Sequence, residues 1–280
     1  MRVCGASRGS NSQSCNGFIS VLSKNGPSLA PVMTQFNRFT AAMGLLFCAS
    51  LVAQQATTPP PSPKAVKASR FLLGSPLDVS LIVEHPPADN SATTARELEQ
   101  LHKLEATRTP QDVQAAKADD VEQDIFIYRN IFGSGFTAEN LPVLAALSAD
   151  VHNEEGVAST PLKNAFARPR PYQLDSTLHP ICKVTTDHNS YPSGHTLSGY
   201  LLGYTMAYIA PDKKDLILAR TDAYAQHRLT CGVHYASDLV ASREIASAMF
   251  GAMLANPVFR ARLAAAQQEL QQRLSVTASR

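Results

Sequence analysis

Three short segments of the chain combine cations, histidines and prolines at spacings that could bind and transform a small anion. In the first, Lys163 to Pro171, three cations crowd the expected end of a helix. Pro169 and Pro171 must stop that helix, because proline lacks the amide hydrogen and clashes with the preceding turn. Cations at a helix C-terminus are ordinary partners of the helix dipole. Rigid guanidinium forks beside two prolines also suit bidentate binding of phosphate.

The second segment, Asn189 to Thr196, reads Asn-Ser-Tyr-Pro-Ser-Gly-His-Thr and precedes an apolar stretch. Ser193 is a natural N-cap, and Gly194 permits a close approach of the backbone. The first turn of a helix offers free amides to an anion. His195 lies in that turn, where the helix dipole disfavours its charged form unless an anion is bound. Many ordinary helices also begin with Ser-Gly, so this segment alone is a weak motif.

The third segment runs from Arg228 to Asp238, and Asp238 follows His234 by four residues. On a helix this spacing lets the carboxylate accept a hydrogen bond from the imidazole. A histidine oriented by an aspartate is a base or a nucleophile. One alternative is a surface pair, and another is a metal site formed by His227, His234 and Asp238. The spacing of these three residues matches no standard metal pattern.

Taken together, the segments resemble the signature of a known family. Lys163-x6-Arg170-Pro171, Pro192-Ser193-Gly194-His195 and Arg228-x5-His234-x3-Asp238 resemble the three-part signature of the type-2 phosphatidic acid phosphatase superfamily. The wider context is similar to the bacterial class A non-specific acid phosphatases, over roughly residues 85 to 270. This sequence departs from their pattern at His227, where serine is usual, and in the order of Asp89 and Asn90.

The resemblance implies a phosphomonoesterase that works through a phosphohistidine and needs no metal or other cofactor. His234 is then the nucleophile, Asp238 fixes its tautomer, and His195 protonates the leaving alcohol. Arg168 is not part of the signature and either supports the pocket or faces solvent. The implied phosphate cradle consists of Lys163, Arg170, Ser193, Gly194 and Arg228.

The cysteines add one expectation. Five cysteines without a Cys-x-x-Cys pair argue against a zinc ribbon or a disulfide scaffold. Cys182 and Cys231 are the only two after the Pro-rich stretch, and each lies near a motif. Two such cysteines readily pair in an oxidising compartment, and the resemblance favours a disulfide between them. The alternative is a pair of buried thiols.

Other functions share parts of this pattern. Vanadate-dependent haloperoxidases belong to the same superfamily, but they are generally longer and carry further pocket residues. A soluble enzyme acting on lipid phosphates is a further alternative. A phosphate-binding module without turnover is the candidate from another class, and the paired His234 and Asp238 argue against it.

Helices are expected to position these motifs. Apolar residues recur at helical spacing through most of the chain after residue 94, and strand-like alternation is arguable only over Leu77 to Val83. The fold is therefore expected to be an all-α, single-domain helical bundle, with the active site at helix ends in the core. The expected helices span residues 95–106, 110–120, 124–132, 141–167, 195–210, 213–231, 237–255 and 256–274.

Composition separates the N-terminal part from the rest. The chain has 280 residues, 44% hydrophobic and 17% charged, with a formal net charge of +2. No acidic residue precedes Asp78, whereas the first 56 residues carry four of the 25 basic ones. The 21 basic and 23 acidic residues that remain give −2. This balance argues against nucleic-acid binding.

The first 56 residues have the layout of a leader with a signal peptide. Arg38 precedes an apolar run of about a dozen residues, which is shorter than a membrane span. The sequence predicts a true start at Met33, a Pro-rich linker over 57–68, a phosphatase-like domain over 69–276 and a tail over 277–280. We expect a periplasmic or secreted enzyme that acts on small phosphate monoesters, without stable membrane insertion once the leader is removed. A homo-oligomer is left open.

Overall fold

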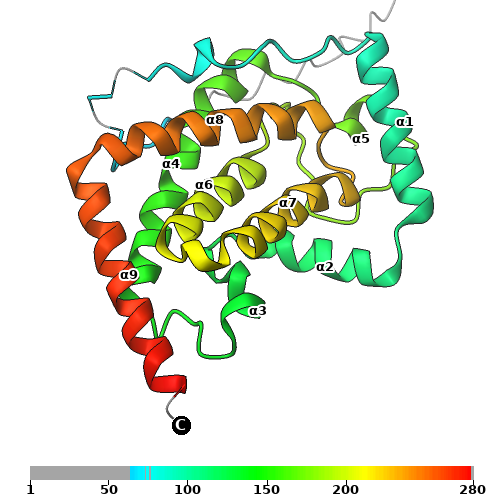
Figure 1. Cartoon of the computed structure of the whole chain (residues 1–280). Coiled ribbons are helices and arrows are strands. Elements are labelled where there is room, and N and C mark those ends of the chain that lie inside the picture. Colours follow the sequence, from blue (N-terminus) through cyan, green and yellow to red (C-terminus); the bar gives the residue numbers. More distant parts are fainter. Residues whose placement is uncertain (1–63, 73, 76, 279–280) are drawn as a thin grey trace, which may run out of the picture. The chain divides into compact units, whose positions relative to one another are not determined.

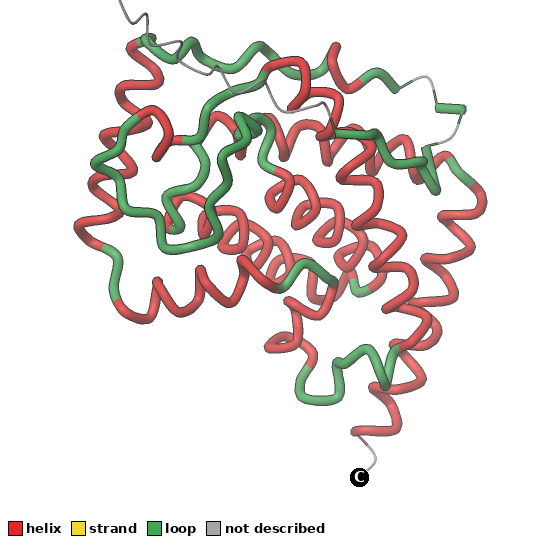
Figure 2. The backbone as a smooth tube through the Cα atoms, turned by 180° about the vertical axis from the view of Figure 1, so that it is seen from behind, coloured by secondary structure: helices red, strands yellow, loops and turns green. Residues whose placement is uncertain are grey.

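Helices make up all the regular secondary structure in the part of the chain that the computed structural model describes, which is residues 64–72, 74–75 and 77–278 (Figures 1 and 2). The expected all-α bundle is therefore confirmed. The elements are η1 (Val79–Leu81), α1 (Ala92–Thr107), α2 (Pro110–Val121), η2 (Ile125–Tyr128), α3 (Arg129–Phe132), α4 (Pro142–Phe166), α5 (Pro171–Leu174), α6 (Gly194–Ile209), η3 (Pro211–Lys213), α7 (Lys214–Thr230), α8 (Ala236–Ala255) and α9 (Pro257–Ala278).

Helix α6 is the centre of the bundle and packs against α4, α7, α8 and α9. It is apolar on all sides, as expected for a helix that is surrounded by others. Leu197 and Leu201 have no exposed surface. Gly199 lets α7 approach closely, because a Cβ at this position would lie 2.6 Å from the ring of Tyr224. This packing fixes the N-terminus of α6 in the interior.

The ends of four helices converge at the predicted site. Ser193 caps α6, and its Oγ accepts a hydrogen bond from the amide of Thr196 at 3.3 Å, as the sequence predicts. Helix α4 ends at Phe166, and Ala167 takes the left-handed conformation (φ 43°) just before the first of the two prolines. The last turn of α7 carries Arg228, and α8 begins two residues after His234.

Two short elements differ from what the sequence suggests. The stretch from Leu77 to Val83 forms the short helix η1 instead of a strand. The carboxylate of Asp78 accepts a hydrogen bond from the amide of Ser80 at 2.9 Å, and such local bonds compete with strand pairing. Pro171 also starts α5, a single turn that the periodicity does not reveal.

The predicted leader, residues 1–56, and residues 57–63 of the predicted linker lie outside the described residues. Residues 64–68, which the sequence assigns to the linker, contact α4. For example, the side-chain amide of Asn164 donates a hydrogen bond to the carbonyl of Lys64 at 3.1 Å. Among the described residues, no helix combines the length and apolar character that a membrane crossing requires.

Candidate active site

His234 lies in the loop before α8, where its imidazole is buried and fixed from both sides. Its Nδ1–H donates a hydrogen bond to Oδ2 of Asp238 at 3.0 Å. Asp238 is helical and His234 is not, in agreement with a helix expected to begin near residue 237. The carboxylate of Asp238 also accepts the amide of Tyr235 at 3.0 Å, so the pair is held across the start of α8. This arrangement selects the tautomer whose free lone pair is on Nε2.

Asp238 is fully buried and receives several hydrogen bonds. Arg168 Nη1 donates to Oδ1 at 2.7 Å, and Ser190 Oγ donates to Oδ2 at 2.6 Å. Burial raises the pKa of Asp238 to about 6, while Arg168, Ser190 and the amide of Tyr235 act in the opposite direction. These donors therefore favour the charged form that His234 needs as a partner.

Arg168 is an interior residue. Of the two alternatives for it, it therefore supports the pocket and does not face solvent. It is 3% exposed, and its guanidinium stacks on the ring of Tyr235 at 3.8 Å from the ring centroid. Its Nη2 donates to Oε2 of Glu97 on α1 at 3.1 Å. Glu97 in turn accepts the amide of Ser237 at 2.6 Å. Arg168 thus joins α1 to the start of α8.

Arg170 contacts the other nitrogen of His234. Its Nη1 donates to Nε2 of His234 at 3.0 Å and to the carbonyl of Val233 at 2.9 Å, and its Nε donates to Asn189 at 2.9 Å. Burial lowers the pKa of His234 well below its usual value, and the nearby cations lower it further. His234 is therefore neutral, and its Nε2 lone pair is directed at the guanidinium of Arg170.

Arg228 is buried at the end of α7 and keeps part of its guanidinium free. Its Nη1 donates to Oδ1 of Asp120 at 2.7 Å. Its Nε is buried without a hydrogen-bond partner among the described residues. A buried unpaired donor is costly, and an anion beside it would remove that cost. Asp120, on α2, also accepts the amide of Lys183 at 3.0 Å.

His195 lies in the first turn of α6, and its Nε2–H donates to the backbone carbonyl of Asp120 at 3.1 Å. Burial, Arg228 and Lys163 together lower the pKa of His195 to about 3. The ring is therefore neutral in the free enzyme. A bound anion would offset the repulsion by Arg228 and Lys163 and favour the charged form.

Lys163 and Gly194 complete the cradle. A Cβ on Gly194 would lie 3.0 Å from the ammonium of Lys163 and against the carboxylate of Glu155, so only glycine permits this close approach. The ammonium of Lys163 is 4.0 Å from Glu155 Oε1. Burial lowers the pKa of Lys163, and Glu155 counteracts the effect. Ser193 adds a buried hydroxyl at the same helix end.

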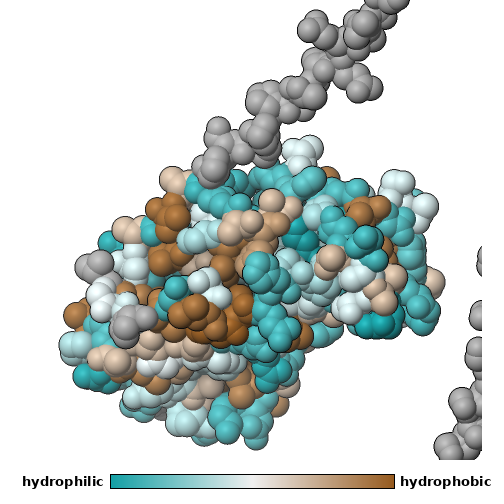
Figure 3. All heavy atoms as spheres, turned by 90° about the horizontal axis from the view of Figure 1, so that it is seen from above, coloured by the Kyte–Doolittle hydropathy of each residue, from teal (hydrophilic) through white to brown (hydrophobic). Residues whose placement is uncertain are grey.

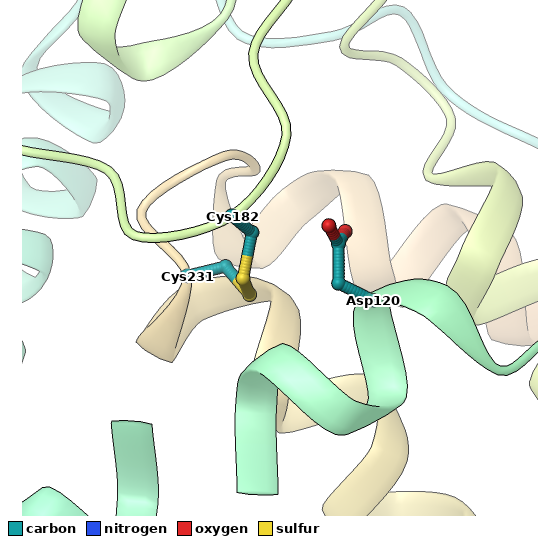
Figure 4. A group of neighbouring side chains, drawn as sticks. All are labelled: Asp120, Cys182 and Cys231. Atoms are coloured by element: carbon teal, nitrogen blue, oxygen red, sulfur yellow. A yellow bond between two sulfur atoms is a disulfide. The ribbon is translucent and has the colours of Figure 1, made fainter. Parts of the chain in front are cut away.

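The predicted disulfide between Cys182 and Cys231 is present, with 5.3 Å between the Cα atoms. Asp120 lies beside it (Figure 4), and three potential ligand atoms of this group lie within 4.8 Å of one another. Because the two sulfurs are bonded to each other, they are not available as thiolate ligands for a metal. The bridge instead connects the loop before α6 to the turn after α7.

His227 points away from the cradle. Its Nδ1 contacts Oδ2 of Asp119 at 2.6 Å, and Arg220 binds the same carboxylate through two hydrogen bonds at 2.9 and 2.6 Å. Among the described residues, neither Asp238 nor the predicted phosphate-binding side chains form a hydrogen bond or an ion pair with the side chains of this trio. His227 therefore helps to hold α2 against α7.

The structure brings the predicted residues together. Lys163, Arg170, Arg228 and His195 all lie close enough to His234 to depress its pKa. Ser193 lies next to Asp238, and its amide donates to the Asp238 carbonyl at 3.4 Å. Four other polar residues of the site carry no signal in the sequence motifs, and these are Glu97, Asp120, Glu155 and Ser190.

Comparison with known proteins finds a matching family and several relatives. Residues 143–262 match the PAP2 superfamily. Over 238 residues the chain is 27% identical to a non-specific acid phosphatase of Providencia stuartii, covering 80% of this chain and 95% of the relative. Over 192 residues it is 29% identical to a non-specific acid phosphatase of Salmonella typhimurium, covering 66% and 77%. A transmembrane PAP2-type phosphatidylglycerolphosphate phosphatase from Bacillus subtilis aligns with a TM-score of 0.43 and 14% identity, over 63% of this chain and 89% of that one. Residues 143–262 therefore form a PAP2 superfamily domain, and this segment contains every predicted site residue from Lys163 to Asp238.

Proposed function

We propose that the protein is a phosphomonoesterase that hydrolyses phosphate esters and releases inorganic phosphate. The single observation that carries this proposal is the environment of His234. Its Nδ1 is hydrogen-bonded to the buried carboxylate of Asp238. Its Nε2 accepts a hydrogen bond at 3.0 Å from the guanidinium of Arg170, a group suited to binding phosphate. The non-specific acid phosphatases among its relatives are consistent with this reaction.

In the first step, Nε2 of His234 attacks phosphorus, and the bond between phosphorus and the ester oxygen breaks. Asp238 stabilises the positive charge that develops on the imidazole. His195 gives its proton to the departing alkoxide, which leaves as an alcohol. Arg170 must move from Nε2 to a phosphate oxygen before the attack, because it occupies the lone pair in the free enzyme.

In the second step, water attacks the phosphohistidine, and the bond between phosphorus and Nε2 breaks. His195, now neutral, accepts the proton from that water, and inorganic phosphate leaves. Lys163, Arg170 and Arg228, with the hydroxyl of Ser193 and the first amides of α6, would balance the charge on the phosphate oxygens. Phosphoryl transfer depends mainly on such positioning and charge stabilisation.

The test is phosphate release from phenyl phosphate by the variant His234→Ala. We expect turnover to fall by at least about a thousandfold, as for the loss of other nucleophiles, with an unchanged circular dichroism spectrum. His179→Ala is the matched control, because its side chain is 78% exposed. Full activity of His234→Ala would exclude the phosphohistidine route.

A second variant separates the acid role from the nucleophile role. His195→Ala should lose activity on alkyl phosphates and keep more of it on nitrophenyl phosphate, whose leaving group needs little protonation. An equal loss on both substrates would exclude His195 as the general acid.

We also propose that the enzyme is exported to the periplasm or secreted. The apolar run after Arg38 has the layout of a signal peptide, and a structural disulfide suits an oxidising compartment. N-terminal sequencing of the protein purified from its source should show a start well after Met33. Recovery of the intact N-terminus from the cell interior would contradict export.

A further inference from the structure

A cavity of about 600 Å³ opens beside the candidate active site. Three parts of the chain form its walls: one face of α4, the loop after the disulfide and the segment 64–68 that precedes the first helix. Its charged lining consists of three lysines and two carboxylates. The lining residues that matter here are Lys64, Lys67, Glu155, Lys163, Asp187 and Asn189.

Two residues belong to both the cavity and the phosphate cradle. Lys163 lines the cavity, and its ammonium lies against the start of α6 at Gly194. Asn189 also lines the cavity and accepts a hydrogen bond from Nε of Arg170 at 2.9 Å. A substrate whose phosphate occupies the cradle can therefore extend its alcohol portion into this cavity.

The segment 64–68 and the three residues after it are held against α4 by several hydrogen bonds. The side chain of Asn153 donates to the carbonyl of Ala68 at 2.8 Å. The buried carboxylate of Glu154 accepts the hydroxyl of Ser69 at 2.7 Å and the amide of Phe71 at 3.0 Å. These contacts place the lysines of the segment over α4. Figure 3 views the molecule from above, and hydrophobic patches lie between hydrophilic residues on that face.

Lys67 supplies a positive charge to the cavity that no acid neutralises. Lys64 is paired with Asp187 at 2.9 Å, and Lys163 has Glu155 nearby. The aliphatic part of Lys67 lies over Gly156, where a Cβ would be 3.0 Å from its Cδ atom. Its ammonium forms no ion pair with the described residues, so the cavity carries one uncompensated cation.

We propose that this cavity is the subsite for the leaving group, and that Lys67 makes it select esters that carry a second anionic group. This inference rests on the proposed phosphomonoesterase function. The second group can be a carboxylate, a sulfonate or another phosphate, because an ammonium acts as a point charge for any of them. The helix α4 and the segment 64–68 then determine substrate preference, while the cradle determines the reaction.

The test compares phosphate release from phenyl phosphate and from 4-sulfophenyl phosphate, which differ by a sulfonate that the enzyme cannot hydrolyse. We expect Lys67→Met to lower kcat/KM for the sulfonated ester about fivefold, the scale of one exposed charge pair, and to leave kcat/KM for phenyl phosphate nearly unchanged. Lys67→Arg should retain the preference. The selectivity of the native enzyme should also weaken as salt is added.

Lys214→Met is the matched control, since Lys214 is exposed at the first residue of α7, at the opposite end from Arg228. It should affect neither substrate. Equal changes on both esters in Lys67→Met would overturn the subsite, and so would a preference that survives this substitution. If the native enzyme released phosphate from neither ester, the proposed function itself would fail, which is a different result.

Discussion

Arg168 binds the carboxylate of Asp238 in the interior, with 2.7 Å between the guanidinium Nη1 and Oδ1. Neither side chain has more than 3% of its surface exposed. The same guanidinium holds Glu97 at 3.1 Å, so one cation serves two buried carboxylates. Asp238 is the residue that orients His234, and Arg168 is therefore a positioning residue one step removed from the reacting atoms.

Replacement of Arg168 should alter both stability and the pH profile. Arg168→Met leaves two buried carboxylates without their cation, and breaking such a contact costs about 3–5 kcal/mol of unfolding free energy. Loss of the positive charge also raises the pKa of Asp238 further, since Arg168 favours its ionised form. The low-pH edge of the kcat profile should move to higher pH. Urea unfolding and kcat from pH 4 to 8 measure the two effects.

Glu97→Gln provides the contrast. It removes the second carboxylate but leaves the ion pair of Arg168 with Asp238 intact, so the low-pH edge should stay where it is. A profile that moves equally in both variants would mean that general destabilisation, and not the charge on Asp238, causes the change.

The pKa of His195 should depend on the ligand. Burial, Arg228 and Lys163 lower it to about 3 in the free protein, where the neutral ring cannot serve as an acid. A phosphate dianion in the cradle stabilises the imidazolium, so its pKa should rise when inorganic phosphate binds. Histidine ring NMR between pH 3 and 7, with and without phosphate, measures this directly. An unchanged titration in saturating phosphate would place the anion elsewhere.

Local sequence predicts the helices and their ends well. Ser193 as an N-cap, and the prolines after Arg168 and Arg170 as a stop signal, act through contacts within a few residues. The resemblance also selected residues that do lie together. Local patterns mislead where a single side-chain contact sets the conformation, as for Asp78 in the stretch where a strand was arguable.

The residues that support the cradle could not be found in this way. Arg168 and Glu97 are 71 residues apart, and Asp120 and Arg228 are 108 apart. Only the packing of α1 and α2 against the later helices brings these charges into contact. An acid whose partner lies on another element looks in the sequence like any exposed acid of a helix.

The unusual residue His227 should be dispensable for turnover. It contacts Asp119 and lies on α7 beside Arg220. His227→Ser should therefore keep kcat/KM for phenyl phosphate within about twofold, while the lost hydrogen bond to a carboxylate lowers stability by about 1–2 kcal/mol. Steady-state kinetics and urea unfolding check both. A large loss of kcat with normal stability would show that this position acts on the cradle.

Removal of the disulfide should weaken the protein as a whole and loosen one wall of the site. The disulfide joins Cys182 to Cys231, which are 49 positions apart in the sequence. In the chain-entropy model, a closed loop of this size contributes about 4 kcal/mol to the free energy of unfolding. The disulfide also holds the turn between Arg228 and His234, where the amide of Ile181 donates to the Cys231 carbonyl at 3.1 Å. The double variant Cys182→Ser, Cys231→Ser should unfold at lower urea and show a raised KM with a smaller change in kcat. The native protein should respond in the same way to dithiothreitol, whereas the variant should be insensitive to it. Equal unfolding midpoints with and without reductant in the native protein would mean that the disulfide adds nothing to its stability.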